Sequence, residues 1–148
     1  MHKFLARGLL IATAALVAST SALADRERQR FCSDSLVRGT YGGQLQGTQT
    51  LPNGSVQNII GVVVRVYDGD GGVTQWDNVK NSANGYVPNR YGSGTYIVND
   101  DCTVVIVFNP APGFTIQERA VVVDNGRELR SITVLPTGLF VTSVQQRI

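Results

Sequence analysis

The fold is decided by the stretch from Val56 to Tyr67, which reads VQNIIGVVVRVY. Its side chains alternate with the two-residue period of a β-strand, so the segment presents two different faces. One face carries Ile60, Val62, Val64 and Val66, and the other carries Ile59, Val63, Arg65 and Tyr67. Thr103–Phe108 and Phe114–Val123 have the same β-branched and alternating character. No window after residue 24 has a convincing 3.6-residue period, so the pattern predicts strands.

Clusters of Asn, Asp, Gly and Pro divide the chain from residue 36 onward into short segments. They occur at residues 51–54, 68–72, 81–94, 99–101, 109–113, 124–126 and 136–138. Seven connections imply eight strands, and short connections favour an antiparallel meander. We therefore predict an all-β domain over residues 36–148 that closes into a single up-and-down barrel, because closure removes exposed strand edges. A β-sandwich is the alternative. Asn125-Gly126 suits a two-residue type I′ hairpin.

Residues 1–24 have the features of a cleaved signal peptide. A positive region at residues 2–7 precedes an apolar run at Leu9–Ala18, which is too short to span a bilayer. A small-x-small cleavage motif follows at residues 22–24. The sequence thus predicts a secreted or periplasmic protein with a polar N-terminal arm at residues 25–35 and no membrane anchor after cleavage.

The two cysteines, Cys32 and Cys102, are expected to form one disulfide. An even cysteine count in an oxidising compartment favours pairing. Two cysteines without histidine cannot form a structural zinc site. The bond would close a loop of about 70 residues and add roughly 4 kcal/mol of stability in the chain-entropy model.

The predicted mature chain has no net charge. The whole chain has 13 Lys and Arg residues and 11 Asp and Glu residues, and Lys3 and Arg7 fall within the leader, so 11 basic residues balance 11 acidic ones. Without a net field there is no reason to expect nucleic acid or anionic lipid as a partner.

Histidine chemistry is excluded, because the only histidine is His2 in the leader. This removes Ser-His-acid triads, Cys-His pairs, histidine bases and histidine metal sites. No phosphate-binding or dinucleotide-binding glycine motif is present. Asp68-Gly69-Asp70-Gly71 matches a calcium loop only in part, and a hairpin turn is the favoured interpretation. The sequence thus assigns no catalytic residue, metal or cofactor and leans away from an enzyme.

Glu118 is the most informative acidic residue, because it interrupts an otherwise apolar face of Phe114–Val123. If Glu118 is buried, it needs a cation nearby. Arg65 is the candidate partner, because Arg119 is a strand neighbour and points to the opposite face. The pair could then line a ligand cavity. A solvent-facing Glu118 at a barrel mouth is the simpler alternative.

Aromatic side chains complete the candidate ligand-binding set. Trp76, Tyr86, Tyr91 and Tyr96 join Arg65 and Glu118 in it, because aromatic rings can stack on a flat ligand. Packing in the core or at the barrel mouth is the alternative role for these rings. The polar segment at residues 78–94 reads as the longest connection, and we interpret it as a lid over the barrel mouth.

Several short motifs occur along most of the chain after residue 38. They are Gly39-Thr40-Tyr41, Gly61 ahead of Asp68-Gly69-Asp70-Gly71, Asn84-Gly85, Gly94-Thr95-Tyr96-x-Val98-x-x-Asp101-Cys102 and Asp124-Asn125-Gly126. Their order resembles that of a group of uncharacterised small secreted β proteins. That group is similar in organisation to the allene oxide cyclase-like barrels, which are relatives of the lipocalins in architecture. The resemblance implies an eight-stranded barrel. It implies no activity, because the plant cyclase's substrate-positioning residues cannot be placed on this sequence.

Three functions remain open at this point. The first is a binding protein for a small apolar or aromatic ligand, since an eight-stranded barrel can hold one small molecule. The second is a histidine-free isomerase or cyclase-like enzyme, which needs a buried carboxylate or tyrosine in a concave site. The third is a structural or protein-interaction domain. An interior filled by Ile60, Val62, Val64 and Phe108 would count against the first.

Overall fold

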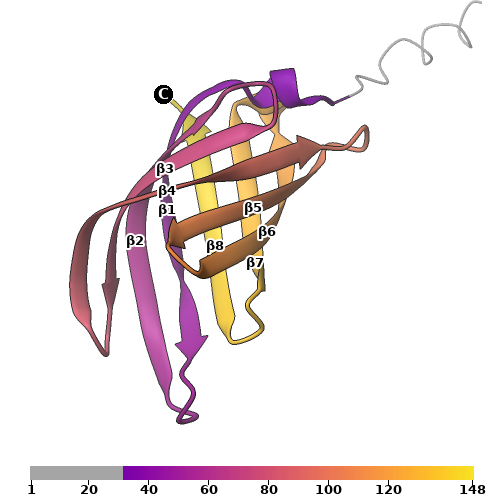
Figure 1. Cartoon of the computed structure of the whole chain (residues 1–148). Coiled ribbons are helices and arrows are strands. Elements are labelled where there is room, and N and C mark those ends of the chain that lie inside the picture. The colour runs from indigo at the N-terminus through magenta and orange to yellow at the C-terminus, as the bar shows by residue number, and fades with distance from the viewer. Residues whose placement is uncertain (1–31) are drawn as a thin grey trace, which may run out of the picture. The chain divides into compact units, whose positions relative to one another are not determined.

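The computed structural model describes residues 32–148. Eight antiparallel strands form a closed barrel in sequence order, with β1 also paired to β8 (Figure 1). The strands are β1 (Gly39–Thr50), β2 (Val56–Tyr67), β3 (Gly72–Asn81), β4 (Gly85–Val98), β5 (Thr103–Ala111), β6 (Phe114–Val123), β7 (Glu128–Leu135) and β8 (Leu139–Arg147). The predicted up-and-down barrel is confirmed, and the sandwich alternative is wrong. The predicted signal peptide and residues 25–31 of the predicted arm lie outside the described residues.

The inward face of β2 is the more polar of its two faces. Ile60, Val62 and Val64 point outward and are 58%, 54% and 39% exposed. The opposite set, which includes Arg65, is buried inside the barrel. The interior is therefore not filled by the first set, although Phe108 of β5 does lie inside. The alternating pattern distinguishes the two faces of the strand but does not decide which face turns inward. In β2 the charged face turns inward, because Arg65 meets its counter-charge inside the barrel.

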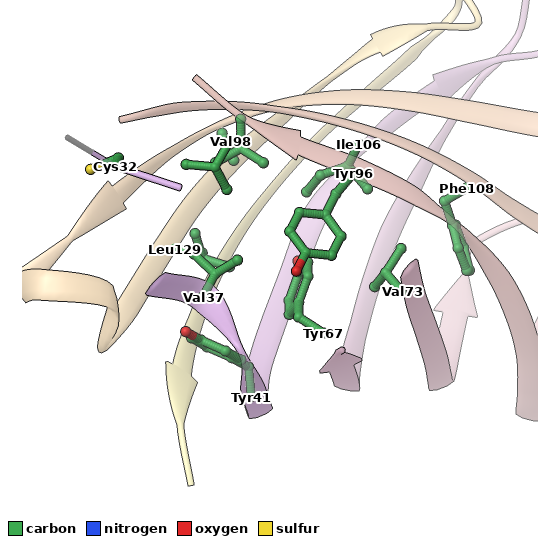
Figure 2. Packing of buried hydrophobic residues seen from close by; sticks show 12 residues of the cluster. Cys32, Val37, Tyr41, Tyr67, Val73, Tyr96, Val98, Ile106, Phe108 and Leu129 are labelled. Carbon is green, nitrogen blue, oxygen red and sulfur yellow. The ribbon is translucent and has the colours of Figure 1, made fainter. Parts of the chain in front are cut away.

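A short 3-10 helix, η2 (Asp34–Val37), packs over the end of the barrel where β1 begins (Figure 1). Val37 is fully buried among the apolar residues of this end, which we call the plug-end core (Figure 2). Its buried members are Cys32, Val37, Tyr41, Tyr67, Val73, Tyr96, Val98, Val104, Ile106, Phe108, Ala120 and Leu129. The rings of Tyr67 and Tyr96 meet edge to face with centroids 5.0 Å apart. This end of the barrel is thus filled.

The disulfide between Cys32 and Cys102 is confirmed, with Cα atoms 5.0 Å apart. It joins the residue ahead of η2 to the turn between β4 and β5. Asp34 adds a second tie, because its Oδ1 accepts a hydrogen bond from the backbone N–H of Val98 at 2.7 Å. The hydroxyl of Tyr96 donates to the carbonyl oxygen of Asp34 at 3.1 Å. The start of the domain is therefore fixed to β4 covalently and by hydrogen bonds.

The segment at residues 78–94 forms a hairpin, so the lid predicted for these residues is wrong. β3 continues to Asn81 and β4 begins at Gly85, and their register shifts by one residue between Asp77 and Val79. Residues 85–92 of β4 do not pair with β5, and they pair with β3 except at Pro88 and Asn89, which lie at the register shift. Pro88 is tolerated there because it has no ladder bond to lose. The turn-forming residues of this segment therefore predict a loop, whereas the structure has a strand there.

Two predicted turns have different outcomes. The Asp68 turn is confirmed, because Asp68 Oδ1 accepts hydrogen bonds from the N–H groups of Asp70 at 2.7 Å and Gly72 at 2.9 Å. The two-residue hairpin at Asn125-Gly126 is wrong. Its connection includes the 3-10 turn η3 (Asp124–Gly126), whose three residues have φ values of 47°, 55° and 82°. The hydroxyl of Tyr41 donates to the Gly126 carbonyl from inside, and this contact fixes the longer loop.

Gly47 of β1 lies where β1 and β8 approach too closely for a side chain. A Cβ atom at this position would lie 1.8 Å from the carbonyl oxygen of Phe140. We expect Gly47→Ala to lower the free energy of unfolding by about 1–3 kcal/mol, because the two backbones must separate. Gly42→Ala on the same strand is the control, since its Cβ would meet only the Ile148 side chain at 3.5 Å. Urea unfolding of both variants measures the difference, and equal effects would contradict the close-approach explanation.

Candidate functional site

A continuous chain of hydrogen-bonded polar side chains crosses the barrel interior. We call it the interior polar chain, and in order of contact it comprises Arg90, Asp77, Gln75, Arg65, Glu118, Ser131, Ser143 and Gln145. All but Arg90 are buried. Along β2, β3 and β8 these positions separate the plug-end core from a smaller apolar cluster, the hairpin-end core, formed by Ile59, Val79 and Leu139. The polar chain therefore forms a layer between two apolar regions.

Arg65 and Glu118 are the centre of this layer. They form a bidentate ion pair, with Arg65 Nη1 2.8 Å from Glu118 Oε2 and Nη2 bonded to Oε1. The Nε of Arg65 donates to the amide oxygen of Gln75, and the hydroxyl of Ser131 donates to Glu118 Oε2 at 2.9 Å. The guanidinium also lies over the ring of Phe108, 5.6 Å from its centroid. This pairing is the buried alternative that the sequence predicted for Glu118, with the predicted partner.

Burial and pairing act in opposite directions on the pKa values of the two groups. Burial alone would raise the pKa of Glu118, but attraction to Arg65 and the hydrogen bonds from Arg65 and Ser131 lower it below the usual value of 4.5. Burial alone would lower the pKa of Arg65, but Glu118 raises it above its ordinary value. Burial raises the pKa of Tyr67, partly offset by the charge of Arg65. The pair is therefore fully ionised at neutral pH, and the buried phenol is neutral.

The lowered pKa of Glu118 predicts an acid-sensitive fold. Its ion pair contributes stability that is present above the unfolded pKa and lost as the pH falls through the folded pKa. We expect the free energy of unfolding to fall as the pH drops below about 4.5. Urea unfolding from neutral to acidic pH checks this. A double variant, Arg65→Met with Glu118→Leu, should have a flatter profile in that range, and an unchanged profile would refute the assignment.

A second ion pair continues the layer toward β4. Arg90 Nε lies 2.7 Å from Asp77 Oδ1, and Arg90 Nη2 lies 3.0 Å from Asp77 Oδ2. The side chain of Asp77 is 1% exposed, whereas that of Arg90 is 32% exposed. Gln75 links the two pairs, because its amide oxygen accepts from Arg65 and its amide nitrogen donates to Asp77. The two cations and two carboxylates thus balance within one network.

A cavity of about 110 Å³ lies on the hairpin-end side of the polar chain. Its polar lining includes Arg65, Gln75, Asp77, Arg90 and Glu118. Its apolar lining consists of Leu45, Ile59, Val79, Phe108, Phe114, Ile116, Leu139 and Val141. The cavity is therefore polar on the side of the interior chain and apolar elsewhere, which is the usual make-up of a small-molecule site.

Gln57 adds a further polar group to this cavity wall. Its amide nitrogen donates to Gln49 Oε1 at 2.7 Å, and both side chains line the cavity. The amide oxygen of Gln57 is buried and has no hydrogen-bond partner among residues 32–148. An unsatisfied buried acceptor costs about 1–3 kcal/mol, so this wall can gain from a hydrogen-bond donor.

The structure brings only two of the six predicted site residues to the interior cavity. Arg65 and Glu118 line the interior cavity. Tyr96 lies in the plug-end core, where its hydroxyl accepts a hydrogen bond from the Gly69 N–H at 2.9 Å. Trp76, Tyr86 and Tyr91 lie on the outer face of β3 and β4 and are 47%, 61% and 54% exposed. Their proposed roles in ligand binding stay predictions.

Sequence reasoning missed Gln75, Asp77 and Arg90. A signal for the first two existed, because they occupy alternate positions of β3 with Val73 and Val79 and so share an inward face. Arg90, the partner of Asp77, lies in the segment that the sequence pattern predicts to be a connection. The pattern therefore does not place Arg90 opposite Asp77.

Residues 32–148 contain neither a metal-binding cluster nor a membrane-spanning helix. This part of the chain has no group of three or more His, Cys, Asp or Glu side chains placed to hold a metal ion. It also has no helix that is long and apolar enough to cross a membrane.

Comparison with known proteins finds structural similarity but no matching sequence family. No family model matches the chain, and no curated protein sequence matches it. The structure is similar to that of the S-type phycobiliprotein lyase CPES from Guillardia theta, with a TM-score of 0.42 and 8% sequence identity. The match covers 88% of this chain and 98% of the lyase chain. This likeness carries no information about function, and the resemblance to allene oxide cyclase-like barrels stays a prediction.

Proposed function

We propose that the protein binds a small, largely apolar molecule in the hairpin-end cavity of its barrel. The observation that carries this proposal is an unfilled space inside the barrel with apolar walls and a buried polar side whose charged groups are paired with one another. Barrel interiors that serve only stability are filled by side chains. Here the filled part is the plug-end core, and the space begins on the other side of Arg65 and Glu118.

The size of the cavity limits the ligand. A closed apolar cavity of about 150 Å³ can take up benzene. The space of about 110 Å³ is smaller than this but partly open, so a single ring or a short branched chain would enter it with part of the molecule in the opening. Larger ligands of ordinary binding sites need roughly 300–1,000 Å³, so only part of such a molecule would fit inside.

The alternative functions are less well supported. A histidine-free enzyme would need a group that exchanges protons near neutral pH, whereas the Glu118 carboxylate is held ionised by Arg65. An interaction domain is favoured by the outward apolar side chains Ile60, Val62 and Trp76, but nothing identifies a partner for that face.

The disulfide supports the proposal that the protein is exported, because such bonds are typical of oxidising compartments.

Toluene is a suitable probe, and we expect it to bind with a Kd of about 1 mM or tighter. Binding should perturb the backbone amide NMR signals of residues that line the cavity, such as Ile59 and Val79. Val141→Phe should abolish these shifts, because the larger side chain fills the cavity.

Val144→Phe is the matched control for this experiment. Val144 lies on the same strand, points outward and is 48% exposed. The Val144 variant should bind toluene as the unsubstituted protein does, and circular dichroism should show that both variants keep their strands. Absence of any toluene-induced shift at about 5 mM, close to the solubility limit of toluene in water, would refute the proposed function.

A further inference from the structure

The cavity offers no uncompensated charge, although four ionised side chains line it. Arg65 is bonded through both terminal nitrogens to Glu118, and Arg90 is bonded through two nitrogens to Asp77. A cavity lined by two arginines would ordinarily favour an acidic ligand. Here each guanidinium already faces a carboxylate, so an acid would lose its hydration without gaining a counter-charge.

The same network offers hydrogen bonds to a neutral group. Each guanidinium has five N–H donors, of which the bonds to Glu118 and Gln75 use only part at Arg65. Carboxylate oxygens accept more than one hydrogen bond. The amide oxygen of Gln57 is a buried acceptor without a partner among residues 32–148. A hydroxyl group both donates and accepts, so it suits this lining better than a charged group or a hydrocarbon.

We propose that the natural ligand is an uncharged, ring-sized alcohol or phenol, bound with its hydroxyl group toward the interior polar chain and its apolar part against the hairpin-end core. This inference rests on the proposed function, because it names the ligand class of the same cavity. The ion pairs act as a charge filter. They satisfy each other and reject organic acids and amines of the same shape.

Four probes of nearly equal shape test the filter: toluene, benzyl alcohol, benzoate and benzylammonium. We expect benzyl alcohol to bind about three- to ten-fold more tightly than toluene, which corresponds to one net neutral hydrogen bond. Benzoate and benzylammonium should bind about ten-fold or more weakly than toluene, because each ion loses hydration without a partner. NMR titration of the unsubstituted protein at neutral pH gives all four affinities.

Asp77→Asn supplies a direct test of the filter. It removes one carboxylate with little change in shape and leaves Arg90 without a counter-charge beside the cavity. Benzoate should then bind about ten-fold or more tightly than it binds the unsubstituted protein, since a hydrogen bond to a charged group becomes available. Asp70→Asn makes the same chemical change in the exposed β2–β3 turn and should leave all four affinities unchanged.

The outcomes separate this inference from the proposed function. If toluene and benzyl alcohol bind equally, or if benzoate binds the unsubstituted protein best, the charge filter is wrong while the cavity still binds ligands. If none of the four probes binds, the proposed function itself fails. The measurements on the unsubstituted protein decide both questions, even if Asp77→Asn does not fold.

Discussion

Replacing Glu118 by glutamine is expected to lower the free energy of unfolding by about 3–5 kcal/mol, the cost of leaving a buried charge without its partner. The glutamine side chain has nearly the same shape, so packing changes little. Arg65, however, remains buried, and the one carboxylate that it contacts within residues 32–148 is lost. Its five donors then face neutral acceptors only, and their desolvation is no longer offset.

A double variant separates two contributions to the free energy of unfolding, that of the two charges and that of burying side chains at these two positions. Arg65→Met with Glu118→Leu removes both ions and fills similar volume with apolar atoms. Such replacements are often neutral or stabilising by about 1–4 kcal/mol. We therefore expect the double variant to be more stable than Glu118→Gln alone. Arg119→Gln is the exposed control on the same strand and should change the free energy of unfolding by less than about 0.5 kcal/mol.

Chemical denaturation of these four proteins provides the measurement. A loss of less than about 1 kcal/mol in Glu118→Gln would mean that Arg65 finds another counter-charge or water, and the buried ion pair would not be the centre of the layer. A double variant that is stable but no longer binds benzyl alcohol more tightly than toluene would show that the ions serve selectivity rather than stability.

The number of strands and their order could be predicted because the evidence is local. Turn residues separate segments of period two, and a closed meander is the arrangement that leaves no free edge. The disulfide followed from cysteine count and the expected compartment. The Arg65–Glu118 pair could be predicted only for the case in which Glu118 is buried, since a buried carboxylate on an apolar face needs a nearby cation.

What could not be predicted depends on contacts between distant segments. The inward direction of β2 is set by the opposite charge on β6, not by the apolarity of either face. The β4 segment looks like a loop because Pro88 and Asn89 interrupt it, yet pairing with β3 makes it a strand. Arg90 therefore lies directly opposite Asp77 because the register shifts by one residue between Asp77 and Val79, which no one-dimensional pattern contains. Long-range pairing thus decides the site, whereas local periodicity decides the strands.

Removing the disulfide by Cys32→Ser together with Cys102→Ser is expected to lower the free energy of unfolding by about 4 kcal/mol. The bond closes a loop of 70 residues, and most of the effect arises because the unfolded chain regains the freedom that the loop had removed. The loss is large beside the total stability of about 5–15 kcal/mol that is typical of a domain.

The native structure contributes a second, local effect of the same substitution. Cys32 is buried in the plug-end core, and the bond holds the start of η2 against β4. Without it, the hydrogen bond from the Val98 N–H to Asp34 and the burial of Val37 must hold η2 in place. We expect the Val98 amide to exchange its hydrogen faster in the double serine variant. The exchange rates of amides at the centre of the barrel should change only as far as the change in global stability requires.

The denaturant dependence separates the two contributions. If the unfolded state expands, the m-value of the serine variant rises, because more surface becomes exposed on unfolding. If only the plug end loosens in the native state, the m-value falls, because the native state then buries less surface that unfolding can expose. We expect the rise to dominate, since the loop covers more than half of the described residues. A variant with unchanged m-value and a loss below about 1 kcal/mol would show that the closed ladder alone holds β1 to β8 together.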